Sequence, residues 1–257
     1  SAGYADALAN LAYPFLDTAS GSTVFRADLH LRQHGDEAGY DQQSGELGVR
    51  HYWGVGAWRL GTGVEGGAAW LDGESYQSTG AVVADARRVF GANTATLRYE
   101  GLHVAGEGEY VYLDGWRHRA QGLLARSVGA YRARGEVAWE INDRRDLTVG
   151  DEFSSHSPER RELGLTVSSP VLREYSLELR GRYRTSDYDE PNRFEQDGVL
   201  LKQSRGDTLI ATGARLRLRK AQDWNWFADY QFSRNDSSID AFDYARHVAA
   251  IGVEWLR

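Results

Sequence analysis

The feature that most constrains the fold of this chain is a two-residue alternation of apolar and polar side chains near its C-terminus. Between residues 224 and 232, Trp, Ala, Tyr and Phe occupy every second position, and Asn, Asp and Gln lie between them. Between residues 212 and 219, Thr, Ala and Leu alternate with Gly and Arg. A period of two is the period of a β-strand. The pattern therefore predicts strands with one apolar face and one polar face.

The same alternation returns along most of the chain. A soluble β-sandwich also alternates, because it buries one face of each sheet. It seldom places aromatic residues at strand ends throughout a chain, as a transmembrane barrel does. In the segment 58–70, Trp58 and Trp70 bound an apolar stripe about 40 Å long at ~3.3 Å per residue. That length is close to the height of a bilayer with its interfaces. We therefore expect an all-β protein, a transmembrane antiparallel β-barrel of the bacterial outer membrane.

Composition is compatible with this expectation. The mean hydropathy is −0.56, but only alternate residues of a barrel strand meet lipid, so the hydropathy of each segment stays low. Eight Trp and fourteen Tyr suit the aromatic belts of a membrane interface. The chain has no cysteine, which fits passage through an oxidising periplasm. A net charge of −7 gives no indication of a nucleic-acid partner.

Residues 1–21 differ from the rest, because their apolar residues recur at roughly helical spacing. Pro14 and Gly21 would end such a helix. We therefore divide the chain into an N-terminal periplasmic helix, plug or linker over residues 1–21 and an outer-membrane barrel over residues 22–257. Two alternatives stay open for the helix: a cap on one barrel mouth, or the remnant of a larger periplasmic domain. The chain does not begin with Met, so we expect it to be processed or excised.

The alternation predicts about fourteen strands, with twelve or sixteen as alternatives. We expect them at 23–32, 46–53, 58–70, 79–90, 94–103, 106–113, 117–128, 130–142, 147–153, 161–171, 174–184, 208–219, 223–233 and 244–257. An even number places both termini on the periplasmic side. The four prolines fall in expected turns, loops or the N-terminal segment, which agrees with unbroken strands.

Connections between the expected strands alternate in length. Short turns are expected at 53–56, 91–93, 142–145, 170–173 and 220–223, and longer polar loops at 33–44, 71–78, 154–160, 185–207 and 234–243. Short periplasmic turns and long outer loops are typical of bacterial outer-membrane barrels. The loop 185–207 is the longest and carries several acids. It could fold inward, cap the pore or contact a partner, and the alternative is a solvated loop.

Arginines dominate the polar faces. Neighbouring strands are expected to set Arg180, Arg182 and Arg184 beside Arg215, Arg217 and Arg219. Like charges directly opposite one another are destabilising unless an acid or a counter-ion intervenes, and charged rings select what passes a pore. We therefore expect an anion-attracting lumen; the alternative is that these charges pair with acids across strands. The predicted pore-lining residues are Arg26, Arg59, Arg117, Arg119, Arg132, Arg134, Arg180, Arg182, Arg184, Arg215, Arg217, Arg219, Glu65, Glu107, Glu109 and Asp229. The predicted lipid-facing belt is Trp58, Trp70, Trp139, Trp224, Trp226 and Trp255.

An enzyme is the alternative to a channel among the functional classes considered. Ser154, Ser155 and His156 lie on an expected outer loop, with Glu152 nearby. Adjacency of Ser and His in sequence is no motif, because catalytic triads are recognised by geometry. The chain has no glycine-rich phosphate loop and no Cys/His metal spacing. We therefore expect no catalytic site, no metal and no cofactor, and the chain is not expected to be an enzyme.

The C-terminal stretch 227–255, FADYQFSRNDSSIDAFDYARHVAAIGVEW, resembles the closing strands of Gram-negative outer-membrane β-barrels, both porins and secretion-linked barrels. In several such families a helical periplasmic domain precedes a barrel that passes exopolysaccharide or assembles surface lipoproteins. These barrels end in Phe or another aromatic residue that the assembly machinery reads. Here Trp255 is followed by two further residues, so either Trp255 serves this purpose or residues are missing.

The resemblance and the lumen charges together imply an outer-membrane channel for hydrophilic, anionic material. Export of a polymer such as exopolysaccharide, by the barrel part of a secretion system, is the leading form. A passive porin for small solutes, a barrel that translocates lipoproteins or proteins, and a barrel enzyme are the alternatives. Expected partners are outer-membrane lipid and lipopolysaccharide, an anionic solute or polymer, and periplasmic secretion proteins.

Overall fold

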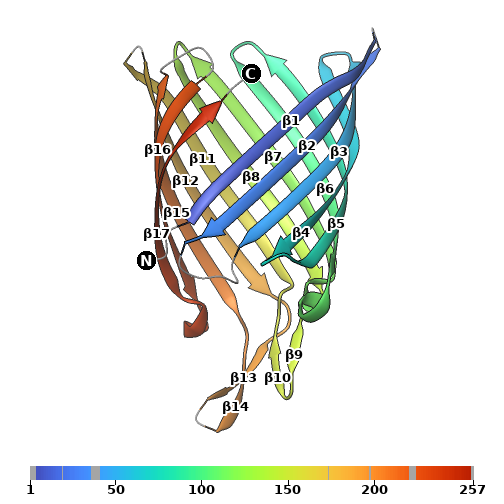
Figure 1. Cartoon of the computed structure of the whole chain (residues 1–257), viewed down its shortest axis with the longest axis vertical. Helices are drawn as coiled ribbons and strands as arrows, with labels where there is room; N and C mark the ends of the chain where they lie inside the picture. The colour runs from blue at the N-terminus through green and yellow to red at the C-terminus, as the bar shows by residue number, and fades with distance from the viewer. Residues whose placement is uncertain are drawn as a thin grey trace.

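Thirteen long strands form one antiparallel sheet in the computed structural model, which describes residues 4–18, 20–35, 41–172, 174–196, 198–219 and 224–255. The sheet curls into a barrel in which each long strand pairs with the next along the chain (Figure 1). The all-β expectation is thereby confirmed. The strands are β1 (Tyr4–Thr18), β2 (Gly21–His34), β3 (Gln42–Val55), β4 (Trp58–Leu71), β5 (Glu74–Phe90), β6 (Asn93–Gly106), β7 (Gly115–Val128), β8 (Tyr131–Arg144), β11 (Pro158–Leu172), β12 (Tyr175–Tyr188), β15 (Gly206–Arg219), β16 (Trp224–Ser237) and β17 (Tyr244–Trp255).

The helix expected over residues 1–21 is wrong: residues 4–18 form β1. This strand pairs with β2 from Tyr4 opposite His34 to Thr18 opposite Gly21. Its apolar residues fit a helical and a strand period equally well, and cross-strand pairing decides between the two, since strand formation depends on neighbours more than on intrinsic preference. Pro14 lies at a bulge in β1, and proline is tolerated there because β1 is an edge strand.

The two edges of the sheet, β1 and β17, run in the same direction. Thirteen antiparallel strands place the start of β1 and the end of β17 at opposite ends of the barrel. The expectation of an even strand number with both termini on one side is therefore wrong for the described strands. No hydrogen-bonded pairing joins β1 to β17 within the described residues.

The two ends of the barrel differ in their connections. At the end drawn uppermost in Figure 1, called the turn end, two-residue connections at 56–57, 91–92 and 129–130 join successive strands. The opposite end, called the loop end, carries the 3-10 helices η1 (Gly108–Leu113) and η2 (Asp240–Phe242). It also carries β9 (Leu147–Val149), β10 (Glu152–Ser154), β13 (Asn192–Gln196) and β14 (Val199–Gln203). These four short strands form a second sheet that projects beyond the barrel (Figure 1).

Four boundaries at the loop end differ from the expectation. The strand expected at 106–113 is η1, and the strand expected at 147–153 is the β9–β10 hairpin outside the barrel. Residues 142–145, expected as a short turn, end β8 at the loop end. The loop expected at 71–78 is a two-residue turn in which Asp72 and Gly73 have φ of +51° and +81°. Asp-Gly with two positive φ angles is a preferred hairpin turn. The loop 185–207 contains β13 and β14 and extends away from the barrel instead of folding inward (Figure 1).

The outer wall of the barrel is apolar and the inner wall is polar. Large apolar side chains such as Leu124, Leu216 and Ile251 are exposed on the outer face, by 53%, 41% and 88%. A soluble protein does not expose apolar surface on this scale, whereas a lipid-facing barrel wall requires it. Among the described residues, no helix has the length and the apolar character needed to cross a membrane.

Candidate functional site: the charged lumen

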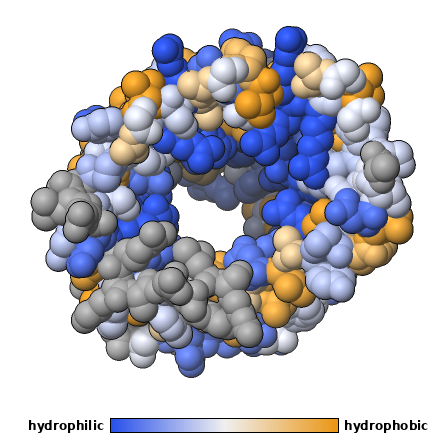
Figure 2. Space-filling view, turned by 90° about the horizontal axis from the view of Figure 1, so that it is seen from above, coloured by the Kyte–Doolittle hydropathy of each residue, from blue (hydrophilic) through white to orange (hydrophobic). Residues whose placement is uncertain are grey.

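Strand alternation directs the charged side chains into the barrel. On β7, Arg117, Arg119 and Gln121 are partly buried, whereas Trp116 and Leu124 on the opposite face are exposed. Seen from the turn end, hydrophilic residues surround an open centre (Figure 2). The lumen is therefore the polar interior of the molecule, and it is the candidate site.

Most of the predicted pore-lining residues have strand positions on the inner face. Glu107 and Glu109 are exceptions, because they lie at the start of η1 and within it, at the loop end. The side chain of Arg219 lies outside the described part of the chain, as does that of Trp255. The inner-face residues are Arg26, Arg59, Glu65, Arg117, Arg119, Arg132, Arg134, Arg180, Arg182, Arg184, Arg215, Arg217 and Asp229. The belt residues Trp58, Trp70, Trp139, Trp224 and Trp226 have outer-face positions.

The two arginine rows expected to lie side by side are offset along the barrel axis. In the register of β12 and β15, Arg180 lies opposite Gly213, and Arg215 lies opposite Glu178. The rows on β7 and β8 are offset in the same way, with Arg119 opposite Glu140. The repulsion expected between these rows is therefore absent, and in both strand pairs an arginine faces an acid.

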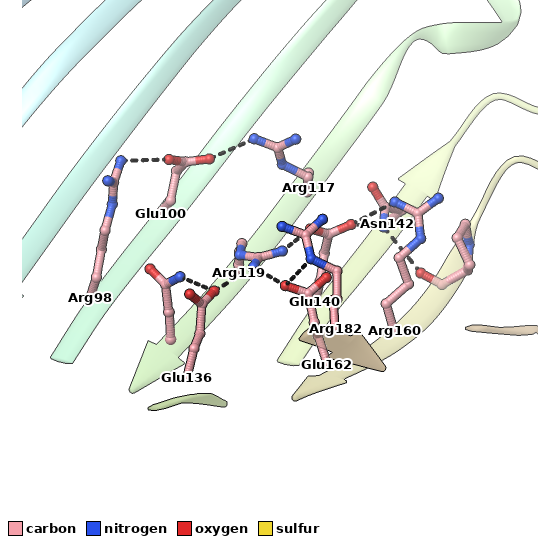
Figure 3. A network of polar contacts seen from close by, with 12 residues as sticks. Arg98, Glu100, Arg117, Arg119, Glu136, Glu140, Asn142, Arg160, Glu162 and Arg182 are labelled. Carbon is pink, nitrogen blue, oxygen red and sulfur yellow. Dashed lines mark hydrogen bonds and ion pairs between the residues drawn. The ribbon is translucent and has the colours of Figure 1, made fainter. Parts of the chain in front are cut away.

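Glu140 is the centre of the largest ion-pair network of the lumen (Figure 3). Its carboxylate accepts hydrogen bonds from Arg119 Nη1 at 3.1 Å, Arg160 Nη1 at 2.9 Å and Asn142 Nδ2 at 2.9 Å. Only 6% of the Glu140 side chain is exposed. A carboxylate this deeply buried is stabilised only when its oxygens are satisfied, and three donors from β7, β8 and β11 satisfy them. The network thus joins three strands on the lumen side.

Glu162 extends this network, and Glu100 forms a separate ion-pair cluster beside it on the wall (Figure 3). Arg119 Nη2 donates to Glu162 at 3.2 Å, and Arg182 lies 3.7 Å from the same carboxylate. Glu100 accepts from Arg98 Nη2 at 2.9 Å and from Arg117 Nη2 at 2.6 Å. Ion pairs therefore follow the inner face from β6 to β12.

A second network occupies the wall formed by β12, β15, β16 and β17. Asp229 accepts from Arg180 Nη2 at 2.7 Å and lies 3.1 Å from Arg215 Nε. Glu254 lies 3.1 Å from Arg215 and 3.2 Å from Arg217. In this wall the arginines pair with acids across strands, which is the alternative that the sequence left open.

Glycines on the inner face of β4 make room for large side chains of β3. A Cβ at Gly63 would lie 2.6 Å from Arg50 Cγ, and one at Gly61 would lie 2.7 Å from the Tyr52 ring. Such distances are shorter than real Cβ contacts, so the glycines let Arg50 and Tyr52 lie flat on the neighbouring strand. Arg50 pairs there with Glu65, and both side chains are at least nine-tenths buried.

The Ser and His residues considered for an enzyme, Ser155 and His156, lie in a loop that is held together by hydrogen bonds to Asp146. The Asp146 carboxylate accepts hydrogen bonds from the backbone N–H of His156, the Ser157 hydroxyl at 3.0 Å and the Ser155 hydroxyl at 3.4 Å. The buried Nε2 of His156 has no partner in the described structure. Burial lowers the pKa of His156 below its usual value, although the Asp146 carboxylate acts to raise the pKa. The ring is thus neutral at pH 7. Ser154 and Glu152 lie in β10, and these residues assemble no Ser–His–Asp relay.

No protein-family model matches the sequence, and no curated protein matches it. Among solved structures, OmpT of Vibrio cholerae, expressed in the outer membrane, is similar over 98% of this chain and 96% of its own, at 10% identity and a TM-score of 0.51. A porin refined at 1.8 Å is similar at 12% identity over 98% of this chain and 99% of its own, with a TM-score of 0.44. The fold is that of a Gram-negative outer-membrane β-barrel. The barrel is therefore placed in the bacterial outer membrane, as expected.

The expectation that the chain is not an enzyme is corrected by these comparisons. The expectation rests on missing motifs, and the similarity with the OmpT structure at a TM-score of 0.51 overturns it. An architecture shared at 10% identity shows a fold and no activity, because function depends on the site and not on the fold. The exclusion of catalysis is therefore withdrawn.

In the described part of the barrel, no group of three or more His, Asp and Glu side chains is arranged to hold a metal ion.

Two adjacent leucines of β7, Leu123 and Leu124, allow a test of which strand positions face the lumen and which face lipid. Both positions start from the same residue type. Leu123 is partly buried and lines a lumen cavity, and Leu124 is 53% exposed on the outer face. We expect a spin label at Leu124→Cys to be relaxed by lipid-soluble oxygen, and one at Leu123→Cys by a water-soluble nickel reagent, because neighbouring strand positions face opposite sides. Electron paramagnetic resonance of the reconstituted protein measures both. Reversed accessibilities would contradict the assignment.

Proposed function

We propose that the barrel is a channel that passes hydrophilic, anionic material across the outer membrane. The observation that carries the proposal is a hydrophilic inner face around an open centre (Figure 2). Near the turn end this inner face carries arginine on most strands, including Arg26, Arg59, Arg87, Arg98, Arg134, Arg180 and Arg217. On β2, β3, β4 and β6 the acids Asp28, Glu46, Glu65 and Glu100 lie nearer the middle of the strands. On β12 and β17, Glu178 and Glu254 lie near the turn end and pair with Arg217, so, among the described residues, the unpaired arginines of this mouth are on β2, β4, β5 and β8. A charged mouth with low-dielectric walls concentrates ions of the opposite sign.

We place the turn end on the periplasmic side, because short turns are periplasmic in bacterial barrels. Anions would then be attracted from the periplasm, which suits export. The narrower proposal is export of an anionic polymer such as exopolysaccharide, with the barrel as part of a secretion system. Arginines from Arg217 near the turn end to Arg160 near the loop end would offer a chain-like anion successive contacts.

A passive porin for small solutes is the second candidate. It is favoured by the finding that residues 4–18 form a strand of the wall and not the plug considered from the sequence. Polymer export predicts retention of an anionic polysaccharide on the purified barrel, and a passive porin predicts none.

Ion selectivity in planar bilayers tests the channel. In a tenfold KCl gradient we expect a reversal potential that indicates anion preference. The preference should weaken at high salt, because the screening length of ~10 Å at 0.1 M shortens. Replacing Arg182 and Arg184 with Gln removes two positive charges from the inner face, so the reversal potential should shift toward cation preference.

The matched control is Arg161→Gln with Arg234→Gln. Both of these arginines have outer-face positions and are 67% and 63% exposed, so the control removes the same charge without altering the lumen. A protein without conductance, or with cation preference, would contradict the proposal. An equal shift in the control would show that net charge, and not the inner face, sets the selectivity.

A further inference from the structure

A cavity of about 570 Å³ lies on the inner face near the turn end, lined by residues of β1 to β8. Seven arginines line it, and Asp85 is the single acid among the residues that line it. Three of the seven have acids outside the lining: Arg50 pairs with Glu65, Arg98 with Glu100 at 2.9 Å and Arg134 with Glu136 at 3.4 Å. The lining of the cavity is thus strongly basic.

The remaining four arginines, Arg26, Arg59, Arg87 and Arg132, form no ion pair with any acid in the described part of the chain. Arg59 donates to the Ser22 hydroxyl at 3.3 Å and lies 4.4 Å from the centre of the Tyr52 ring. Neither contact neutralises its charge. The pattern contrasts with the networks around Glu140 and Asp229, where each arginine reaches a carboxylate.

Two of these four arginines lie directly opposite each other. In the register of β4 and β5, Arg59 is the partner of Arg87. Like charges opposite each other on paired strands are destabilising. The described inner face also holds an acidic pair, Asp28 opposite Glu46, but Arg59 and Arg87 bring two positive charges together. The pair is compensated when an anion binds between the two side chains. Guanidinium groups bind phosphate and carboxylate through two parallel hydrogen bonds each, so two to four arginines suit a ligand with several oxyanion groups.

We propose that this cavity is a binding site for a multivalent oxyanion, a molecule or chain segment that carries several phosphate or carboxylate groups. The inference deepens the proposed function, because it names the class of the transported material and a site that this material occupies before it crosses the barrel. Thr94 and Thr96 of β6 also line the cavity and supply hydroxyl donors for the same oxygens. Strand β6 pairs with β5, where Arg87 lies opposite Thr96.

Binding is tested on the folded, detergent-solubilised barrel by isothermal titration calorimetry with two probes, tripolyphosphate and trigalacturonate. We expect saturable binding of at least one probe at 0.1 M salt, and binding at least tenfold weaker for Arg59→Gln with Arg87→Gln. The matched control is Arg88→Gln with Arg126→Gln. These two arginines lie on the outer faces of β5 and β7, so the control loses the same charge and should bind as the unaltered protein does.

Thermal unfolding gives a second readout. Without a probe, Arg59→Gln with Arg87→Gln should raise the Tm, because it removes a repulsive pair. The probe should raise the Tm of the unaltered barrel by more than that of the variant, since a ligand stabilises the state that it binds in proportion to its affinity. If this variant does not fold, Arg26→Gln with Arg132→Gln replaces it, with binding expected to weaken at least threefold.

The outcomes separate the two proposals. Binding of tripolyphosphate alone assigns phosphate as the ligand chemistry, and binding of trigalacturonate alone assigns carboxylate. If neither probe binds, or if the cavity variants bind as tightly as the control, the site is wrong, and a channel with measured anion preference still stands. If both probes bind and no conductance is found, the channel is wrong and the site stands.

Discussion

Replacing Glu140 with Gln is expected to lower the free energy of unfolding of the barrel by about 2 kcal/mol, which is typical of hydrogen bonds to charged groups. The change removes the charge that faces Arg119 and Arg160 and leaves both guanidinium groups inside the wall. Breaking a fully buried pair costs about 3–5 kcal/mol. The smaller value is expected here because Arg119 and Arg160 are 27% and 31% exposed, so lumen water solvates them in part.

Urea unfolding in lipid vesicles, followed by tryptophan fluorescence, measures this loss. Glu159→Gln is the matched control, since Glu159 also pairs with an arginine, Arg161 at 2.8 Å, but is 35% exposed. The control is expected to lose much less stability, as exposed pairs do. Equal losses in the two variants would contradict the structural role of the lumen network.

Gly115→Ala is expected to destabilise the barrel by about 3 kcal/mol, at the upper end of the cost of a strained backbone position. Gly115 has a φ of +141° at the start of β7, in the region that side chains other than glycine avoid. A Cβ at this position would also overlap with the carbonyl oxygen of Asp143. Strands β7 and β8 would have to separate at the loop end to accommodate the added methyl group.

Gly135→Ala is the control for that change. No atom lies within 4 Å of a Cβ built at Gly135 in β8, so a change within about 0.5 kcal/mol is expected. The same urea titration compares the two variants. If both lose equal stability, general strand effects of alanine explain the result, and the close approach of β7 and β8 at Gly115 does not.

The positions at which sequence analysis was wrong share a physical cause. Residues 4–18 and 106–113 have side-chain patterns that fit more than one period, and pairing with a distant segment selects one of them. β1 is a strand because β2 lies beside it. The β9–β10 hairpin belongs to a separate sheet because β13, about forty residues later along the chain, pairs with β10 through Phe153 and Arg193. The local sequence of β1 does not identify β2 as its partner, and that of β10 does not identify β13.

The sequence by itself determined which side chains face lipid and which face the lumen. Alternation is a local property of an extended chain, and a slip of one residue exchanges the two faces, so Arg217 and Trp226 could be assigned from pattern alone. Register was decided only by the tertiary structure, because it depends on how far each strand is displaced along its neighbour. That displacement separates the arginines of β12 from those of β15, sets Arg119 opposite Glu140, and leaves Arg59 opposite Arg87. The one like-charged pair on which the binding proposal depends follows from register and from no motif.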